Sequence, residues 1–500
     1  MFFTGASGLV GEYILSTVAT YILGNSIEQF SITIALMLGM MGVGGWVQKF
    51  ISSHLLLEKL ILIEVLLALL IGFAPIVIYG AFGYLGDHFN LILYFFILSI
   101  GFLIGFEIPL IIRLNESFST TLKENLSTVI SADYFGSLVG AMLWVYFLLP
   151  NFAITQSSFL ISALNFSIAM MMALYFGLFK QLKHPILSAI LLLLTVAMLI
   201  VGYTNESKWN LSLEQKLYDD KIVLSQSTRY QHLVMTHNKN MDEYRFYING
   251  NVQFSSLDEK RYHEFLVHPV VRMNPEIRKV LILGGGDGLA LRELNRYPDL
   301  EKVVLVDLDP EMVKIASQNT HLKALNKNAF ENAKVHIGKS PVVFSGEVQK
   351  ENTKLEVFHI DADRFLDELY FEKFDIVIID FPDPNSIELT KLYSKEFYLK
   401  LKRLLKPSGS AVIQATSPYH AKEAFLCIRR TLESAGFNTV PYHYNIPSFG
   451  DWGWILFSQK PNLDYLLNVN NNFGVETEFL TPALFKASLQ FGKGGATFIK

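Results

Sequence analysis

Cysteine is nearly absent from this sequence. Cys427 is the single cysteine among 500 residues, so no disulfide can form within the chain. This indicates that the part of the chain that carries it faces a reducing compartment. Cys427 lies in a helical-looking run, Ala424–Ile428, and we expect its thiol to be buried and structural.

Charge is also scarce in the first part of the chain. Residues 1–203 hold 15 of the Asp, Glu, Lys and Arg residues, whereas residues 204–500 hold 73, and the change is abrupt near Tyr203. The contrast predicts a membrane half followed by a soluble half. The soluble half has 36 basic and 37 acidic residues. Because it has no excess of positive charge to neutralise phosphates, nucleic acid is not an expected partner.

Long apolar runs fill the membrane half. Each is close to the ~20 residues that an α-helix needs to cross a bilayer. No cleavable signal peptide is expected, because the first run lacks a basic start and a cleavage site. We predict a transmembrane bundle of about seven helices, at residues 3–23, 30–50, 57–85, 89–113, 127–149, 152–178 and 185–203.

The basic residues of this half fall in alternate loops. They are Lys49 and Lys59, Arg113 and Lys123, and Lys180 and Lys183. The positive-inside rule makes these loops cytoplasmic and, with seven helices, puts the chain after Tyr203 on the opposite face. A soluble domain that needs a nucleotide-type cosubstrate requires the cytoplasm. Either one helix is miscounted or the weak charge bias misleads, and we expect the soluble half to be cytoplasmic.

The soluble half changes pattern along its length. Residues 204–270 are expected to form a linker and a small antiparallel β-domain, with a turn at Asn249–Asn251. From Lys279 short apolar strands alternate with helices, which predicts a Rossmann-like parallel sheet over residues 271–460. Residues 461–500 are expected to form a C-terminal tail.

A glycine turn follows the first strand of this pattern. Gly284–Gly288 would let a ligand approach the backbone, next to the start of a helix. Asp307 ends the next strand, where an acid can accept hydrogen bonds from ribose hydroxyls. Asp361 follows a third strand and could accept from an adenine amino group. Taken singly these acids are typical helix caps, but three at successive strand ends favour an adenosyl pocket.

Two further acids follow the fourth strand, in Asp380-Phe-Pro-Asp383. Carboxylates three residues apart across a proline-stiffened loop can face one cavity and attract an ammonium group or accept its proton. The alternative is a rigid turn with capping acids. The Asn/Asp-Pro-Pro-aromatic loop of amino-methyltransferases does not fit, since here Phe precedes the proline and Asp follows it.

Together these residues resemble the polyamine aminopropyltransferases, or spermidine synthases, over about residues 218–460. The membrane half resembles the membrane-anchored bacterial branch of that family. The motifs that carry the resemblance are Tyr230-Gln231-His232, Asn249-Gly250 with Gln253, Asp258-Glu259, Tyr262-His263-Glu264, Gly284–Gly288, Asp307, Asp361-Ala362, Asp380 with Asp383, and Ile446-Pro447-Ser448-Phe449.

The resemblance implies transfer of an aminopropyl group from decarboxylated S-adenosylmethionine to putrescine or a related amine, with release of methylthioadenosine. It implies no tightly bound cofactor and no metal, a dimer or tetramer, and a multi-pass protein of the inner membrane. The expected donor-binding residues are Gln231, Asp307, Asp361 and Ala362 for the nucleoside, and His263 and Asp287 for the aminopropyl end.

Asp287 also points to this donor by charge, because a carboxylate attracts an ammonium group and repels the carboxylate of S-adenosylmethionine itself. Asp380 is the expected base, helped by Tyr262, while Asp383 and Gln253 are expected to bind the amine. The family usually has tyrosine at the position of Phe449. Phe449 lacks that hydroxyl, so the acceptor could be a longer or otherwise altered amine.

Four acids lie at apparent membrane depth, namely Glu12, Glu64, Glu107 and Asp133. Such residues are costly in a bilayer and are candidates for function. The alternative is that they hold helices together or lie beyond helix ends. An acid-rich bundle keeps open a polyamine transporter or sensor whose soluble domain binds without catalysis. A methyltransferase on the same sheet is the third hypothesis.

Overall fold

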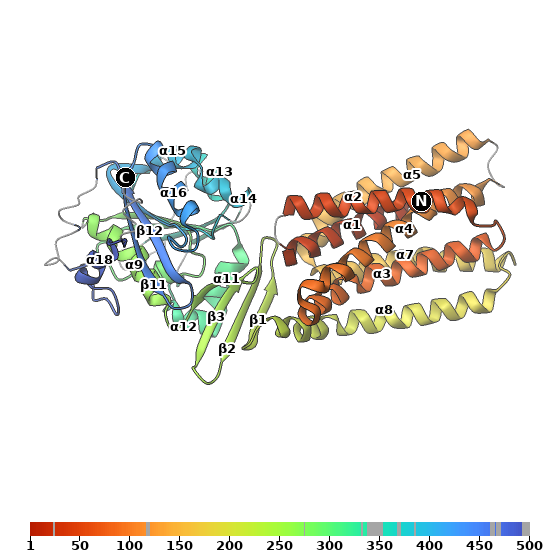
Figure 1. The fold of residues 1–500 in the computed structure, drawn as a ribbon, viewed down its shortest axis with the longest axis horizontal. Helices are drawn as coiled ribbons and strands as arrows, with labels where there is room; N and C mark the ends of the chain where they lie inside the picture. Colours follow the sequence, from red (N-terminus) through yellow and green to blue (C-terminus); the bar gives the residue numbers. More distant parts are fainter. Residues whose placement is uncertain are drawn as a thin grey trace. The chain divides into compact units, whose positions relative to one another are not determined.

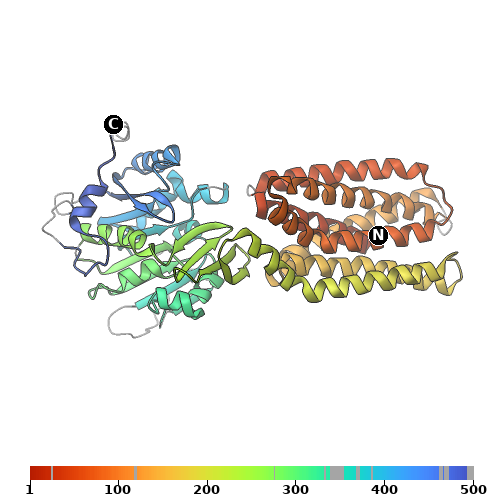
Figure 2. The same ribbon diagram turned by 60° about the horizontal axis from the view of Figure 1, so that its bottom comes forward.

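The computed structural model describes residues 1–23, 26–116, 121–274, 276–331, 334–337, 354–367, 372–384, 387–460, 466 and 472–492. The chain divides into two compact units, Met1–Ile222 and Val223–Lys500. Figures 1 and 2 show the first as a bundle of long helices and the second as two sheets with covering helices. The division into four segments at residues 203, 270 and 460 stays a prediction.

Most of the described residues of the first unit are helical, apart from short connections between helices and the start of β1 (Lys221–Ser227). Seven helices are long and apolar enough to cross a membrane, which confirms the predicted number of long apolar helices. They are α1 (Phe2–Leu23), α2 (Ser26–Val47, extended by Gln48–Phe50), α3 (Leu56–Leu85), α4 (Phe89–Asn115), α5 with its π-helical and α6 extensions (Leu122–Asn151), α7 (Ile154–Leu178) and α8 (Pro185–Glu214).

Helix α8 is longer than the sequence predicts. The linker expected after Tyr203 is instead helical to Glu214, and a 3₁₀ turn follows at Gln215–Leu217. Glu206 anchors this stretch, because its carboxylate accepts hydrogen bonds from Thr155 (2.7 Å), Gln156 (3.1 Å) and Asn210 (3.1 Å). The helix therefore continues past its apolar run because a neighbouring helix supplies polar partners.

The second unit begins with a four-stranded sheet of strands β1 (Lys221–Ser227), β2 (His232–Asn238), β3 (Glu243–Ile248) and β4 (Asn251–Ser255), in the order β1-β2-β3-β4. Asn249 and Gly250 both have positive φ, 49° and 78°, between the paired residues Ile248 and Asn251. This is the Asn-Gly hairpin turn that the sequence indicated.

The second sheet has eight strands in the order β11-β12-β10-β9-β5-β6-β8-β7. Pairing is parallel from β10 to β7, while β12 is antiparallel to both β10 and β11. The strands are β5 (Lys279–Gly284), β6 (Lys302–Val306), β7 (Lys334–Ile337), β8 (Lys354–His359), β9 (Phe374–Asp380), β10 (Leu405–Gln414), β11 (Asn438–Ile446) and β12 (Gly450–Ser458).

Alternate residues of the central strands pack into two apolar cores, one on each face of the sheet. Val280 and Ile282 of β5 belong to one apolar cluster, and Leu281 and Leu283 to the other. Because successive side chains in a strand point to opposite faces, both faces are covered, as a Rossmann-like sheet requires. The helices are α9 (Glu259–Met273), α10 (Leu289–Leu294), α11 (Pro310–Gln318), α12 (Thr320–Leu325), α13 (Ala362–Asp367), α14 (Ile387–Thr390), α15 (Lys395–Leu404), α16 (Lys422–Ser434) and α18 (Pro482–Ser488).

The expected burial of Cys427 is wrong. Residue 427 lies on α16, as its helical pattern indicated, but the side chain is exposed. The buried face of this amphipathic helix is formed by Phe425, Ile428 and Leu432. Cys427 falls outside that face, so it is available to solvent.

Candidate active site

Helix α9 and strand β9 bring a tyrosine and an aspartate together. The Tyr262 hydroxyl donates a 2.7 Å hydrogen bond to Oδ1 of Asp380, the last residue of β9. Burial, followed by the charge of Asp287, raises the pKa of Asp380 to about 6, although His263 and the Tyr262 hydrogen bond oppose the rise. A carboxylate with this pKa is a stronger base than an ordinary aspartate and is still ionised at neutral pH.

Glu259, one turn earlier on α9, positions the neighbouring His263. Its Oε2 lies 3.1 Å from Nδ1 of His263, and Arg292 binds both of its carboxylate oxygens at 2.7 and 2.9 Å. Burial acts to raise the pKa of Glu259, but hydrogen bonds from His263 and Arg292 hold it below its ordinary value. Burial lowers the pKa of His263, but Glu259, Asp287 and Asp380 raise it more, so the net shift is upward.

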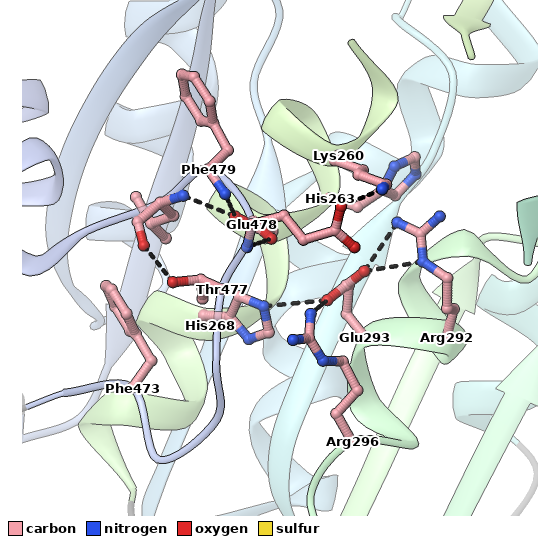
Figure 3. A network of polar contacts seen from close by, with 12 residues as sticks. Lys260, His263, His268, Arg292, Glu293, Arg296, Phe473, Thr477, Glu478 and Phe479 are labelled. Carbon is pink, nitrogen blue, oxygen red and sulfur yellow. Dashed lines mark hydrogen bonds and ion pairs between the residues drawn. The ribbon is translucent and has the colours of Figure 1, made fainter. Parts of the chain in front are cut away.

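Arg292 is held from its other side. Figure 3 shows Glu293 between Arg292, Arg296 and His268, with contacts of 2.8, 2.8 and 3.1 Å. Arg292 and Glu293 are only 4% and 3% exposed. A buried, fully paired network of this kind has few alternative arrangements, so it fixes the orientation of His263.

The glycine turn joins β5 to α10. Gly286 donates its N–H to Oδ2 of Asp307 at 3.0 Å, and a Cβ at Gly286 would lie only 2.5 Å from that oxygen. Asp287 accepts the N–H of Leu289 at 2.8 Å, at the start of α10. Burial raises the pKa of Asp287, opposed by His263, and burial raises that of Asp307 to about 7. Asp287 and Asp307 are therefore half-buried acids held beside a backbone that a ligand can approach closely.

The glycine turn also lies against Asp380, the last residue of β9. Gly284 has φ +84°, and a Cβ there would lie 2.2 Å from the carbonyl oxygen of Asp380. Gly284 and Asp380 are paired in the parallel ladder of β5 and β9. Only glycine permits this backbone conformation and approach at low cost.

Asp361 follows β8 and caps α13, with the N–H groups of Asp363 and Arg364 at 2.9 and 3.3 Å. It also forms an ion pair with Lys391 at 2.6 Å. Burial acts to raise the pKa of Asp361, but Lys391 holds it below the ordinary value. Ala362 is buried as the first residue of α13.

Gln231 contacts an acid that the sequence reasoning did not single out. Its Nε2 donates to Oδ2 of Asp309 at 2.9 Å, and Thr228 donates to the same oxygen at 2.7 Å. Asp309 follows Asp307 by two residues and caps α11. The sequence could have indicated Asp309, because an acid directly before a proline is typical of a helix start, and proline is a common first residue of a helix.

Asp383 is held by two residues from the end of β10. Gln414 and Thr416 each donate a 3.2 Å hydrogen bond to its carboxylate. Burial raises the pKa of Asp383, opposed by these two bonds. Gln414 was missed, although a polar residue that ends the apolar run Ala411–Ile413 at the carboxyl edge of a sheet is a recognisable signal.

Phe449 lies in the turn between β11 and β12. Its ring is 5.9 Å from that of Tyr262 and 5.1 Å from that of Trp452, measured between centroids. Asp258, which is 4% exposed, fixes the turn by accepting bonds from Ser448 at 2.7 and 2.9 Å. Phe449 is thus brought to the Tyr262–Asp380 pair. Gln253, on β4, instead donates to the carbonyl of Asn251 at 3.4 Å.

One group of side chains consists of residue types that can ligate a metal ion. Donor atoms of Glu264, His268 and Glu293 lie within 4.8 Å of one another. Glu264 nevertheless accepts three backbone N–H groups, from residues 478–480 at 2.7 to 2.9 Å. His268 also contacts the Tyr297 hydroxyl at 2.8 Å. These existing bonds give the group a structural role, in which α9 is tied to the C-terminal segment.

The sheet, its glycine turn and the acids at its carboxyl edge define a Rossmann-like domain with a candidate ligand site at that edge. The spermine/spermidine synthase domain model matches residues 259–470. The polyamine aminopropyltransferase of Leptospira interrogans serogroup Icterohaemorrhagiae serovar copenhageni is 38% identical over 454 residues, covering 91% of this chain and 86% of that protein. That of Oceanobacillus iheyensis is 36% identical over 490 residues, covering 97% and 89%. Polyamine aminopropyltransferase 2 of Aquifex aeolicus is 37% identical over 495 residues, covering 99% and 93%.

The chain belongs to the polyamine aminopropyltransferase family, and it is an enzyme that transfers aminopropyl groups. The resemblance noted in the sequence is thereby confirmed. A non-catalytic transporter or sensor and a methyltransferase are not favoured, because the relatives carry the transferase name over most of both chains.

Proposed function

We propose that this site transfers the aminopropyl group of decarboxylated S-adenosylmethionine to putrescine or a related amine. The products are a spermidine-type polyamine and methylthioadenosine. The observation that carries the proposal is the hydrogen bond from Tyr262 to Asp380 beside the glycine turn. Asp380, a base with a raised pKa, therefore lies next to the glycine turn where a nucleoside-bearing donor would bind.

The donor is proposed to lie along the carboxyl edge of β5, β6 and β8. Gln231, Asp307, Asp361 and Ala362 would hold its nucleoside, and Asp287 with His263 its aminopropyl end. The half-buried Asp287 supports this assignment, because a cationic ligand would favour its ionised form. No tightly bound cofactor is part of the proposal, and nucleic acid is not a proposed partner.

The reaction is a direct displacement. The acceptor nitrogen attacks the carbon next to the sulfonium, a new C–N bond forms, and the C–S electron pair goes to sulfur to give methylthioadenosine. An amine of pKa about 10 must lose a proton first. Asp380 accepts that proton, while Tyr262 orients its carboxylate, and general-base catalysis of this kind contributes about 10²–10⁴-fold.

The acceptor is proposed to lie between Asp383, Tyr262 and Phe449, with Gln253 as a further contact. Asp383 supports this role because Gln414 and Thr416 hold its carboxylate in place. A fixed carboxylate near the base can bind the far ammonium group of a diamine. Phe449 makes this side more apolar than a tyrosine would.

A panel of diamines tests the function. The full-length protein in detergent or nanodiscs is given decarboxylated S-adenosylmethionine and one amine at a time, and methylthioadenosine release is measured. Asp380→Asn should lower kcat by about 10²–10⁴-fold. Glu301→Gln, at an exposed ion pair with Arg278, is the control and should keep wild-type activity. No release from the wild type with any amine would overturn the proposal.

The seven long apolar helices are proposed to span the inner membrane, with the catalytic unit in the cytoplasm and the protein a homo-oligomer. Cys427 provides the test of sidedness, because it is the single cysteine and is exposed on the catalytic unit. A membrane-impermeant maleimide should label it in lysed cells but not in intact ones. Labelling in intact cells would place the catalytic unit outside, as the charges of the loops predict.

A further inference from the structure

Three acids meet inside the helical unit, each from a different helix. They are Glu64 of α3, Glu107 of α4 and Asp133 of α5. The charges of Glu64 and Asp133 both act on Glu107, so both acids lie within electrostatic range of it. Glu64 and Glu107 are 1% and 3% exposed, and Asp133 is half-buried.

Helix α1 passes beside these acids. A Cβ at Gly5 would lie 2.8 Å from Oδ1 of Asp133, so the absence of a side chain there lets the carboxylate reach α1. A Cβ at Gly8, the next small residue on this face, would lie 3.4 Å from Ile104, which precedes Glu107 by one turn of α4. The first two turns of α1 are therefore level with Asp133 and Glu107.

The register of α1 and α3 brings Glu64 to the same level. Gly11 lies against Ile71, and the rings of Tyr21 and Tyr79 are 6.3 Å apart, so the two helices run in the same direction. Seven residues before Gly11 and Ile71 are Thr4 and Glu64. Seven residues are two helical turns, so Glu64 shares a face with Ile71.

Helix α7 contributes an amide at this level. The Ser7 hydroxyl donates a hydrogen bond to Oδ1 of Asn165, which is 0% exposed. Nδ2 of Asn165 and Oε2 of Glu64 are both buried, and neither has a hydrogen-bond partner within the described part of the chain. Buried polar atoms nearly always have partners, so a donor and an acceptor without one indicate a bound polar group.

The positive charge near these acids is small. Within the described residues, the amino group of Met1 acts on all three. The side chains of Lys59 and Arg113 instead bond Ser52 and Ser53, between α2 and α3. Three carboxylates facing one amino group leave a site that favours further cations.

A cavity adjoins this cluster. Its volume is about 240 Å³, larger than the ~30 Å³ share of one water molecule. Ala132 of its wall directly precedes Asp133, and Ile111 follows Glu107 by one turn of α4. The other lining residues are Met1, Leu114, Asn115, Thr128, Val129 and Phe176, and the cavity is open on one side. An open, mostly apolar cavity next to carboxylates suits a molecule with alkyl segments and ammonium groups, whereas a bare metal ion gains nothing from apolar walls.

We propose that Glu64, Glu107, Asp133 and Asn165 form a second binding site, inside the helical unit, for an alkyl polyammonium cation. The cation is of the class that the catalytic unit makes, so this choice of ligand rests on the proposed function. The carboxylates bind ammonium groups, and the cavity takes the alkyl chain. The site gives the helical unit a role in holding or passing polyamines, beyond anchoring.

Carbodiimide labelling tests the site in the unaltered protein. Dicyclohexylcarbodiimide, which reacts with carboxyl groups in apolar surroundings, should modify Glu64 or Glu107 of the full-length protein in nanodiscs. Spermidine should protect these residues at least several-fold, as measured by peptide mass spectrometry, and sodium chloride at the same ionic strength should not. Protection by sodium alone would indicate an inorganic cation site and overturn the proposal, as would equal labelling with and without spermidine.

Binding stoichiometry provides the second test. Equilibrium dialysis of radiolabelled spermidine should give two sites per wild-type chain and one in Glu64→Gln. Glu12→Gln is the matched control, since Glu12 is a buried acid on α1 outside the cluster, and should keep two. Methylthioadenosine binding is measured in each variant to report a folded catalytic unit. One site in the wild type, or two in Glu64→Gln, would overturn the second site, whereas failure of the transferase function would be seen separately as absent methylthioadenosine release.

Discussion

The hydroxyl of Tyr262 donates to Oδ1 of Asp380 across 2.7 Å. This bond favours the ionised carboxylate, so it opposes the rise in the pKa of Asp380 that burial and Asp287 cause, and the resulting pKa is about 6. The tyrosine therefore helps to keep this base ionised at neutral pH.

Tyr262→Phe should move the acidic limb of the kcat/KM profile to higher pH. Loss of the donated bond raises the pKa of Asp380 above about 6, so a smaller fraction of the base is ionised at a given acidic pH. The measurement is methylthioadenosine release between pH 5 and 9. Titration of the acceptor amine is common to both proteins and cancels in the comparison. An unmoved or lowered limb would rule out Asp380 as the group that this bond controls.

Asp287→Asn should weaken the choice of donor. A charged hydrogen bond contributes about 1.5–3 kcal/mol, so the preference for decarboxylated S-adenosylmethionine over S-adenosylmethionine in binding should fall about 10- to 100-fold. Competition for bound methylthioadenosine measures both affinities. Glu301→Gln, at an exposed ion pair with Arg278, should leave the ratio unchanged. An unchanged ratio in the Asp287 variant would show that this acid does not select the donor.

Glu259→Gln should destabilise the catalytic unit and misorient His263. Removing one partner of a buried pair costs up to about 3–5 kcal/mol, and here the guanidinium of Arg292 loses the charge of Glu259 and keeps only that of Glu293. Thermal unfolding followed by tryptophan fluorescence should therefore show a lower midpoint. Arg278→Gln removes an exposed pair with Glu301, which contributes under about 1 kcal/mol, and serves as the control. Equal midpoints for the two variants would contradict the structural role of Glu259.

Phe449→Tyr should change the choice of acceptor rather than of donor. A new hydroxyl between Tyr262 and Trp452 can bond an amine, and a hydrogen bond contributes about 0.5–1.5 kcal/mol. We expect kcat/KM for putrescine to rise about 2- to 10-fold relative to longer amines. The KM for the donor should stay constant, and Phe449→Leu should lower the rate with every acceptor. A change in the KM for the donor, with no change in acceptor preference, would show that Phe449 does not line the acceptor-binding part of the site.

Apolar patterns predicted much of this fold. Strands such as β5 and β9 are buried on both faces, so their continuous apolar runs stand out in the sequence. Helix α9 was not predicted because it buries Glu264, His268 and Arg272, residue types that usually indicate a surface. Their burial depends on partners far away in the sequence. Strand β11 was missed too, because Pro441 and its half-buried residues obscure the pattern.

The residues of the candidate site also fall into two groups, those that local sequence patterns predict and those that depend on distant partners. Glycine turns and acids at strand ends have fixed spacing in the sequence, so Asp287, Asp307 and Asp380 could be predicted. The bond between Gln231 and Asp309, and that between Asp258 and Ser448, join segments 78 and 190 residues apart. Such contacts depend on tertiary packing, which local patterns do not contain.

Gly284 packs so closely against the carbonyl of Asp380 that the glycine turn and the proposed base cannot move independently of each other. A substitution on either strand would therefore disturb both substrates at once. The hairpin that carries Phe449 is attached separately, through Asp258 and Ser448. Evolution can thus alter the amine that the enzyme accepts by changing one hairpin, while the apparatus that activates the donor stays intact.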